Sequence, residues 1–237
     1  PGGHSSRPRK DNAIYDLADA LTVIQNYQFP INHNELTLKY FRATGNKRMD
    51  NVGKAMKDFA INPNNQDAIS VLYLNGYAGT LGTTCVATML RGGHAENALP
   101  QSATATINCR IFPGTGIQNT LTQLKNAVNN SQIEFSMLGI PTETDPSPLR
   151  EDVIAALQEA VDIKYPGLEI IPGMSSGGTD GMHFRAAGIP SYGVNGGYGK
   201  ASDSFAHGLN ERILVQSFYD NLAHWYVLLK AIASPKS

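Results

Sequence analysis

The sequence predicts an α+β protein whose first part is a βαββαβ two-layer sandwich with its first strand truncated. Residues 83–90 and 102–111 are rich in Thr and β-branched residues and flank a loop bounded by Gly-Gly and Pro, as in an antiparallel hairpin. Apolar residues at helical spacing precede and follow this hairpin. Residues 142–148 have linker composition, and beyond them the pattern becomes α/β. We therefore predict one domain over residues 1–141 and a second over 142–237.

The first expected helix follows Asp11, which is placed to cap it. Its apolar stripe is formed by Ile14, Leu17, Ala18, Leu21 and Ile24. Residues 31–70 have a weak and polar pattern, and we interpret them as an insertion in the first domain. The insertion is expected to be helical around residues 52–59, and no chemistry is assigned to it.

Side chains alternate between the two faces of a strand, and in the second hairpin strand this alternation separates apolar from polar residues. One face carries Ala103, Ala105, Ile107, Cys109 and Ile111, and the other carries Thr104, Thr106, Asn108 and Arg110. The apolar face is expected to pack against helices. The polar face, with Arg110 and the nearby loop residues His94 and Asn97, is expected to form a substrate-facing wall.

The two cysteines lie opposite each other if the hairpin is symmetric about Asn97, because Cys85 and Cys109 are equally distant from that residue. Two small buried thiols on the apolar face are the favoured interpretation. A disulfide is the alternative, and the cysteine count alone does not determine the compartment.

After the hairpin, Thr115 is placed to cap a helix over residues 117–128, and a short strand at 133–138 completes the first domain. The second domain is expected to contain a helix near residues 153–161, strands at 168–171 and 189–194, and a last helix. The apolar spacing of that last helix predicts a buried core helix, with Val215, Phe218, Leu222, Trp225, Leu229 and Ile232 on one side.

The whole chain excludes some classes of partner. Its 237 residues carry a formal net charge of -1, so neither nucleic acid nor an anionic membrane surface is an expected partner. The sequence has no run approaching the ~20 apolar residues of a membrane span. It opens on Pro1-Gly2-Gly3 without an initiator Met, so we expect a cut piece of a longer protein or a processed product.

Two loops of the second domain have residues suited to binding chemistry. In the loop 175–180, Gly177 and Gly178 expose backbone N–H groups ahead of a short helix, which suits a substrate carboxylate. The alternative is a tight turn that needs positive φ angles. A serine nucleophile is a weaker interpretation, because the Gly-x-Ser-x-Gly spacing is missing.

Among the histidines, His207 lies in a loop and is the best candidate for a metal ligand, with Glu211 in a supporting position. The alternative is a surface histidine. His4 lies in an exposed, turn-like setting, and His33, His183 and His224 are expected to be structural. A catalytic zinc needs about three protein ligands, so the residues alone predict an incomplete site.

Four segments together resemble a family of zinc-dependent exopeptidases and amidohydrolases. They are Gly3–Pro8 with Asn12–Ile14, Gly93–Pro100 running on to Arg110–Gly114, Ser176–Asp180, and Ala206–Glu211. The family includes aminoacylase, carnosinase, glutamate carboxypeptidase, carboxypeptidase S and succinyl-diaminopimelate desuccinylase. The segment 206–213 and the insertion at residues 31–70 most resemble the carboxypeptidase S-like branch of the family.

The resemblance implies a catalytic α/β domain that binds two zinc ions and a βαββαβ lid that often forms a homodimer. It implies that His4 reaches a neighbouring active site and stabilises an oxyanion there. It implies that Asn97 and Arg110 bind substrate, the arginine through a carboxylate. It also implies that the substrate's terminal carboxylate is held by Gly177, Gly178 and Thr179. The zinc ligand that the resemblance implies in this chain is His207. His94 lies where the family varies and receives no role.

The family's other zinc ligands and its general-base Glu lie in an N-terminal segment that this sequence does not contain. The chain is therefore expected to be the lid and the C-terminal part of a dizinc peptidase that uses a zinc-activated water. Alone it is expected to hold an incomplete zinc site and to be inactive. The substrate is a small peptide or, as an alternative, an N-acyl amino acid. Two further alternatives are a non-catalytic dimerisation or ligand-binding module and a redox-controlled hairpin.

Overall fold

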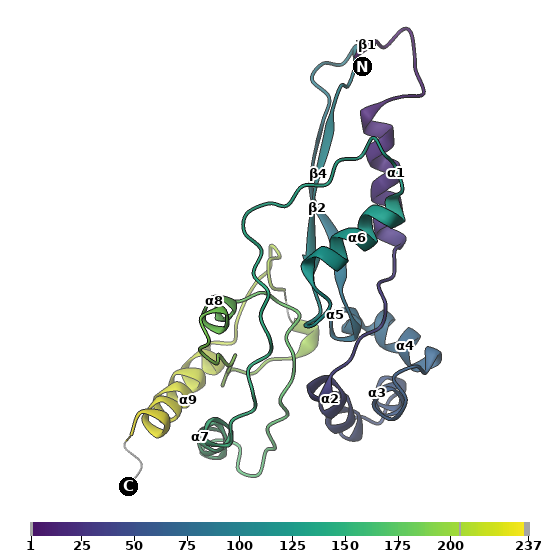
Figure 1. The fold of residues 1–237 in the computed structure, drawn as a ribbon. Coiled ribbons are helices and arrows are strands. Elements are labelled where there is room, and N and C mark those ends of the chain that lie inside the picture. The colour runs from purple at the N-terminus through teal and green to yellow at the C-terminus, as the bar shows by residue number, and fades with distance from the viewer. Residues whose placement is uncertain (1, 204, 235–237) are drawn as a thin grey trace. The chain divides into compact units, whose positions relative to one another are not determined.

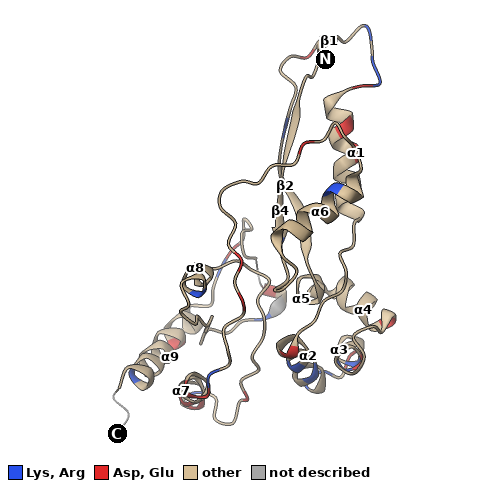
Figure 2. Cartoon of the chain, viewed as in Figure 1, with Lys and Arg blue, Asp and Glu red and all other residues tan. Residues whose placement is uncertain are grey.

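The computed structural model describes residues 2–203 and 205–234, and the chain forms two compact units. Unit 1 comprises Pro1–Asp145 and Pro172–Ala186, and unit 2 comprises Pro146–Ile171 and Ala187–Ser237. Each unit has a hydrophobic core of its own. Basic and acidic side chains are interspersed along both units rather than gathered on one segment (Figure 2).

Unit 1 is built from a long hairpin, two helices packed on it and a cluster of shorter helices (Figure 1). Its elements in chain order are β1 (Gly3–His4), α1 (Ala13–Asn26), α2 (Glu35–Asn46), α3 (Asn51–Ile61), α4 (Gln66–Leu72), a π-helical turn (Tyr73–Tyr77), α5 (Ala78–Leu81), β2 (Thr84–Gly92), β3 (Ala98–Leu99), β4 (Ala103–Arg110), α6 (Ile117–Val128) and α8 (Gly181–Ala186).

The hairpin of β2 and β4 confirms the two predicted strands and their register at the base. Thr84 pairs with Arg110, and Cys85 pairs with Cys109, as symmetry about Asn97 requires. A β-bulge between Ala87 and Met89 shifts the pairing by one residue toward the tip. A second, very short sheet forms where β1 pairs with β3.

The favoured interpretation of two free thiols was wrong, because Cys85 and Cys109 form a disulfide in the structure. Their Cα atoms are 4.1 Å apart. This is close to the roughly 4.5 Å of directly opposed residues in antiparallel strands. Facing positions on adjacent strands therefore bring the two sulfur atoms within bonding reach.

Helices α1 and α6 cover the apolar face of the hairpin, as the alternation predicted. Ile24, Phe29 and Leu124 form the buried centre, and Ile107 and the disulfide pack against it. Both predicted caps were wrong. The cap of α1 is Asn12, whose side chain accepts from the Ile14 N–H, while Asp11 pairs with Arg9. The cap of α6 is Gly116 rather than Thr115, and the Ile117 N–H donates to the Glu143 carboxylate.

The insertion is a helical subdomain with the largest apolar core of unit 1. The predicted helix around residues 52–59 is confirmed as α3, and the helices run on to the end of α5. Its fully buried apolar side chains are Phe41, Met56, Phe59, Leu72 and Leu81. The Asn32 N–H donates to the Leu81 oxygen at 2.7 Å, so the two ends of the insertion meet next to β2.

Unit 2 consists of α7 (Glu151–Asp162), a 3-10 turn (Ala201–Asp203) and α9 (Val215–Ala233), joined by extended loops. Ala156 and Ala160 of α7 pack against Leu228 of α9. The predicted buried stripe of α9 was wrong, since Val215 is 72% and Leu229 is 57% exposed. The buried face of α9 instead carries Ser217, His224 and Leu228. This face packs against α7 and against a loop of unit 2.

The predicted strands at 133–138, 168–171 and 189–194 do not form. A strand requires a hydrogen-bonded partner, and no other part of the described chain pairs with these segments. Within the residues that the structure describes, the sheets are therefore two small antiparallel pairs rather than the complete βαββαβ sandwich. The described helices include none with the length and apolar character needed to cross a membrane.

Candidate functional site

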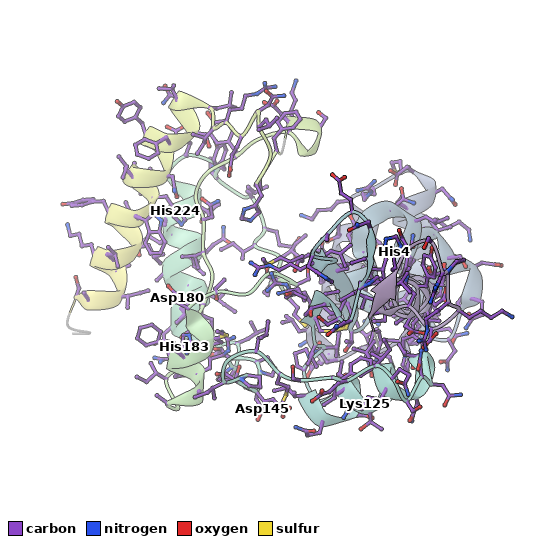
Figure 3. The ribbon with its side chains drawn as sticks, turned by 90° about the horizontal axis from the view of Figure 1, so that it is seen from above. His4, Lys125, Asp145, Asp180, His183 and His224 are labelled. Carbon is purple, nitrogen blue, oxygen red and sulfur yellow. A yellow bond between two sulfur atoms is a disulfide. The ribbon has the colours of Figure 1, made fainter. Side chains whose placement is uncertain are left out.

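His4 and Asn97 lie together near the tip of the hairpin. His4 pairs with Ala98 across the β1–β3 sheet, and the Ser5 N–H donates to the Asn97 oxygen at 2.9 Å. Both side chains are exposed, and His4 is labelled in Figure 3. The structure thus brings together two of the site residues expected from the sequence.

Ser6 determines which nitrogen of His4 carries the proton. The Ser6 backbone N–H lies 3.1 Å from Nδ1 of His4, and the Ser6 hydroxyl lies 2.8 Å from the same atom. A backbone N–H can only donate, so Nδ1 accepts and the neutral ring carries its proton on Nε2. His4 therefore presents an exposed Nε2–H donor, the type of group that stabilises a developing oxyanion. The sequence gives no specific signal for this role of Ser6, which becomes apparent only from the turn that brings Ser6 back to the His4 ring.

Arg110 and Gly178 lie together at the opposite end of the hairpin. A Cβ atom built on Gly178 would lie only 2.7 Å from Nη1 of Arg110. Neither Gly177 nor Gly178 has a positive φ angle, so the alternative of a tight turn that needs positive φ angles was wrong. A side chain at 178 would force the Arg110 guanidinium to move from this position. This contact joins the polar face of β4 to the loop 175–180.

The hydrogen bonds of the loop around Gly178 weaken the expectation that a helix N-terminus there binds an anion, and leave Arg110 as the nearby cation. The Gly177 N–H is already occupied by the Ser175 hydroxyl at 3.2 Å. Thr179 is exposed, and its carbonyl accepts from the Met182 N–H at the start of α8. This helix has six residues, too few for a strong terminal dipole.

The helical insertion supports this loop from the other side, a role that the sequence analysis did not assign. A Cβ on Gly79 would lie 2.6 Å from Cβ of Ser176, and a Cβ on Gly173 would lie 3.1 Å from Cδ2 of Tyr40. Burial raises the pKa of Tyr40, and the nearby Tyr77 raises it further. The glycines at 79 and 173 are the only sequence signal for these contacts.

The two pairs of residues are too far apart to share one small substrate within a single chain. Pairing places Ala103 near the tip and Arg110 at the base of β4, seven residues along one strand. At about 3.3 Å per residue, the two ends of β4 are about 23 Å apart. An extended dipeptide spans only about 7 Å. Asn97, expected beside Arg110, is instead beside His4.

In unit 2, His207 lies on an exposed loop with a backbone conformation that is rare for a residue other than glycine. Its φ angle is 63°, in the left-handed region, and its N–H donates to Oε2 of Glu211 at 3.2 Å. Arg212 pairs with Asp203 and lies over the ring of Phe205 at 4.9 Å, which ties the loop together. Left-handed backbone at such a residue costs about 1–2 kcal/mol and is frequent at functional sites.

The described residues contain no group of three or more His, Cys, Asp or Glu side chains that could hold a metal ion. His207 therefore stands without the further ligands that a catalytic zinc needs. Of the other histidines, His224 is buried on α9 (Figure 3), and His183 is exposed on α8.

A protein-family model described as a peptidase dimerisation domain matches residues 1–135. The mouse N-fatty-acyl-amino acid synthase/hydrolase PM20D1 is 31% identical over 144 residues, which cover 59% of this chain and 29% of that protein. Probable carboxypeptidase S-like 2 of Dictyostelium discoideum is 25% identical over 238 residues, which cover 97% of this chain and 44% of that protein.

A solved M20 family metallo-carboxypeptidase, Sso-CP2 from Sulfolobus solfataricus, has the same fold with a TM-score of 0.56. At 17% identity the match covers 97% of this chain and 58% of that one. The chain spans less than half the length of the curated relatives it matches. The dimerisation-domain match over more than half of the residues decides the family. The chain belongs to the M20 peptidase family, in its carboxypeptidase S-like branch.

Proposed function

We propose that this chain is part of a hydrolase of the carboxypeptidase or dipeptidase type, which cleaves short peptides. Residues 1–141 form its lid, and residues 142–237 form the C-terminal part of its catalytic domain. The contact between Arg110 and Gly178 is the observation that carries this proposal. A guanidinium can bind a carboxylate through two parallel hydrogen bonds. The absence of a side chain at Gly178 lets the Arg110 guanidinium lie directly against the loop 175–180. Gly177 and Thr179 border the same position.

His4 and Asn97 have their role at the site of a second copy of the chain. The ~23 Å between the ends of β4 prevents His4 from reaching a small substrate that is held by Arg110 of its own chain. A homodimer through the lid removes this difficulty, because the tip of one lid then serves the partner's site. The Nε2–H of His4 donates to the carbonyl oxygen of the scissile amide as that oxygen becomes negative.

The metal ions of the proposed enzyme need ligands from outside the described residues, because those residues form no metal site. We assign His207 as a ligand that this chain supplies, and the remaining ligands of two zinc ions to sequence beyond the 237 residues. Zinc calorimetry on the 237-residue chain tests this assignment. We expect only weak binding that is lost in His207→Ala, whereas tight stoichiometric binding would contradict the assignment.

The activity test uses a protein in which this chain is joined to the segment that carries the other zinc ligands. It measures the release of free amino acid from dipeptides. Arg110→Gln should raise KM for dipeptides, with little change for substrates whose terminal carboxylate is amidated. Failure to hydrolyse any dipeptide or N-acyl amino acid would refute the proposal. The second candidate is an N-acyl amino acid amidohydrolase, which is favoured by similarity to the mouse N-fatty-acyl-amino acid synthase/hydrolase. A higher kcat/KM for N-acyl amino acids than for dipeptides would select it.

A further inference from the structure

A pocket of about 360 Å³ lies at the base of the hairpin, within unit 1, and Ala78 and Gly79 of α5 contribute to its lining. Its walls come from the end of α1 and the segment after it, from the insertion, from β2 and from the end of β4. The loop before α8 contributes Ser176. The volume lies within the roughly 300–1,000 Å³ that is typical of small-molecule sites.

The pocket has a mixed lining in which apolar surface predominates. Ile24 and Phe29 are buried and belong to the core under the hairpin. Tyr73 and Val86 also line the pocket, but they are 39% and 58% exposed. Exposed apolar side chains gathered around a hollow, rather than scattered singly, indicate a surface that receives an apolar group.

Among the residues that the structure describes, Arg110 is the only charged one that lines the pocket. Within the described residues its guanidinium makes no hydrogen bond or ion pair. The Arg110 side chain also approaches Gly178, as described above. A single free cation at the edge of a hollow with a predominantly apolar lining favours a ligand with one carboxylate and an apolar group attached close to it.

We infer that this pocket receives the apolar side chain of the amino acid that carries the substrate's terminal carboxylate. The inference rests on the proposed function, since it uses Arg110 as the carboxylate partner. Arg110 is itself a wall of the pocket, so the apolar group must be joined to the carboxylate by one or two carbons, as an amino-acid side chain is. An acyl group on the nitrogen lies on the far side of the amide and is further away.

The helical insertion then acts as a specificity element of the enzyme. It supplies Tyr73 and Ala78 to the wall, and the close approach of Gly79 to Ser176 holds the loop 175–180 at the rim. Substitutions in the insertion should therefore change which terminal amino acids bind, without changing the affinity for the carboxylate itself.

The test measures binding of N-acetyl-phenylalanine, N-acetyl-glycine and N-acetyl-phenylalanine amide to the chain by NMR titration. Burying the benzyl group should make N-acetyl-phenylalanine bind about tenfold or more tightly than N-acetyl-glycine. The amide should bind most weakly. The variant Ala78→Phe should fill the pocket. It should lower the affinity for N-acetyl-phenylalanine to that for N-acetyl-glycine and leave the affinity for N-acetyl-glycine unchanged.

A second variant avoids any dependence on the folding of Ala78→Phe. Tyr73→Ala should weaken the binding of N-acetyl-phenylalanine severalfold. The matched control is Leu74→Ala, at a neighbouring position that is 85% exposed and outside the pocket, and it should leave this binding unchanged. Equal binding of the two acids, with both weakened by Arg110→Gln, would overturn the inference and leave the carboxylate site standing. No binding of either acid, or binding that Arg110→Gln leaves unchanged, would overturn the carboxylate site as well.

Discussion

Reduction of the disulfide between Cys85 and Cys109 should lower the free energy of unfolding by about 3.5 kcal/mol. The bond joins residues 24 apart in the sequence. In the chain-entropy account, a closed loop of that length reduces the entropy of the unfolded chain by about 11.6 cal/mol/K, which is about 3.5 kcal/mol near 25 °C. The folded hairpin already holds the two cysteines in facing positions, so the folded state should change little on reduction.

Urea unfolding of the oxidised and the reduced protein measures this difference on one and the same sequence. The double variant Cys85→Ala/Cys109→Ala is the control, and reductant should not change its stability. A difference below about 1 kcal/mol, with a thiol count that shows the bond fully reduced, would refute the loop-entropy reasoning. Two free thiols in the protein before any reductant is added would restore the interpretation of two buried thiols.

Three further measurements test other parts of the structure. Phe59→Ala in the fully buried core of the insertion should cost about 3–5 kcal/mol of stability, whereas Met49→Ala, at a fully exposed position, should stay within about 0.5 kcal/mol. The hydrogen bond from Arg48 and the cap contact at α3 lower the pKa of Asp50 to about 2, so its stabilising contribution is complete above the ordinary pKa of 3.8 and is lost as the pH falls toward 2. An NMR titration of Asp50 should show this midpoint, and Arg48→Ala should move it up toward 3.8; an unchanged midpoint would contradict the assigned cause. Nitrogen NMR of the neutral His4 ring should show the proton on Nε2, and a proton on Nδ1 would contradict the acceptor role assigned from Ser6.

Local sequence rules were sufficient for the hairpin, because strand alternation acts within a few residues of chain. They correctly separated the buried face with Ile107 from the polar face with Arg110, and they placed the two cysteines opposite each other. They did not locate the bulge near Thr88, which changes the register of the outer half without leaving a strong composition signal.

The same rules failed where the outcome depends on a distant partner. The segment 133–138 has strand character, but no neighbouring strand pairs with it in the described chain. Helix α9 is apolar around most of its surface, so spacing alone could not tell which side packs against α7. The choice of Asn12 over Asp11 as a cap is a difference of one residue that backbone geometry decides.

The family was readable from short motifs, and the same motifs supply the proposed binding residues, because the chemistry of a guanidinium, an imidazole or a glycine backbone is a property of the residue type. Which residues act together is a property of the folded chain. Strand pairing places Asn97 with His4 and separates both from Arg110, while loop packing brings Gly178 and the helical insertion to Arg110. Contacts between residues far apart in sequence arise from the packing of whole elements, so only the tertiary structure could assign the pocket beside Arg110 to the insertion.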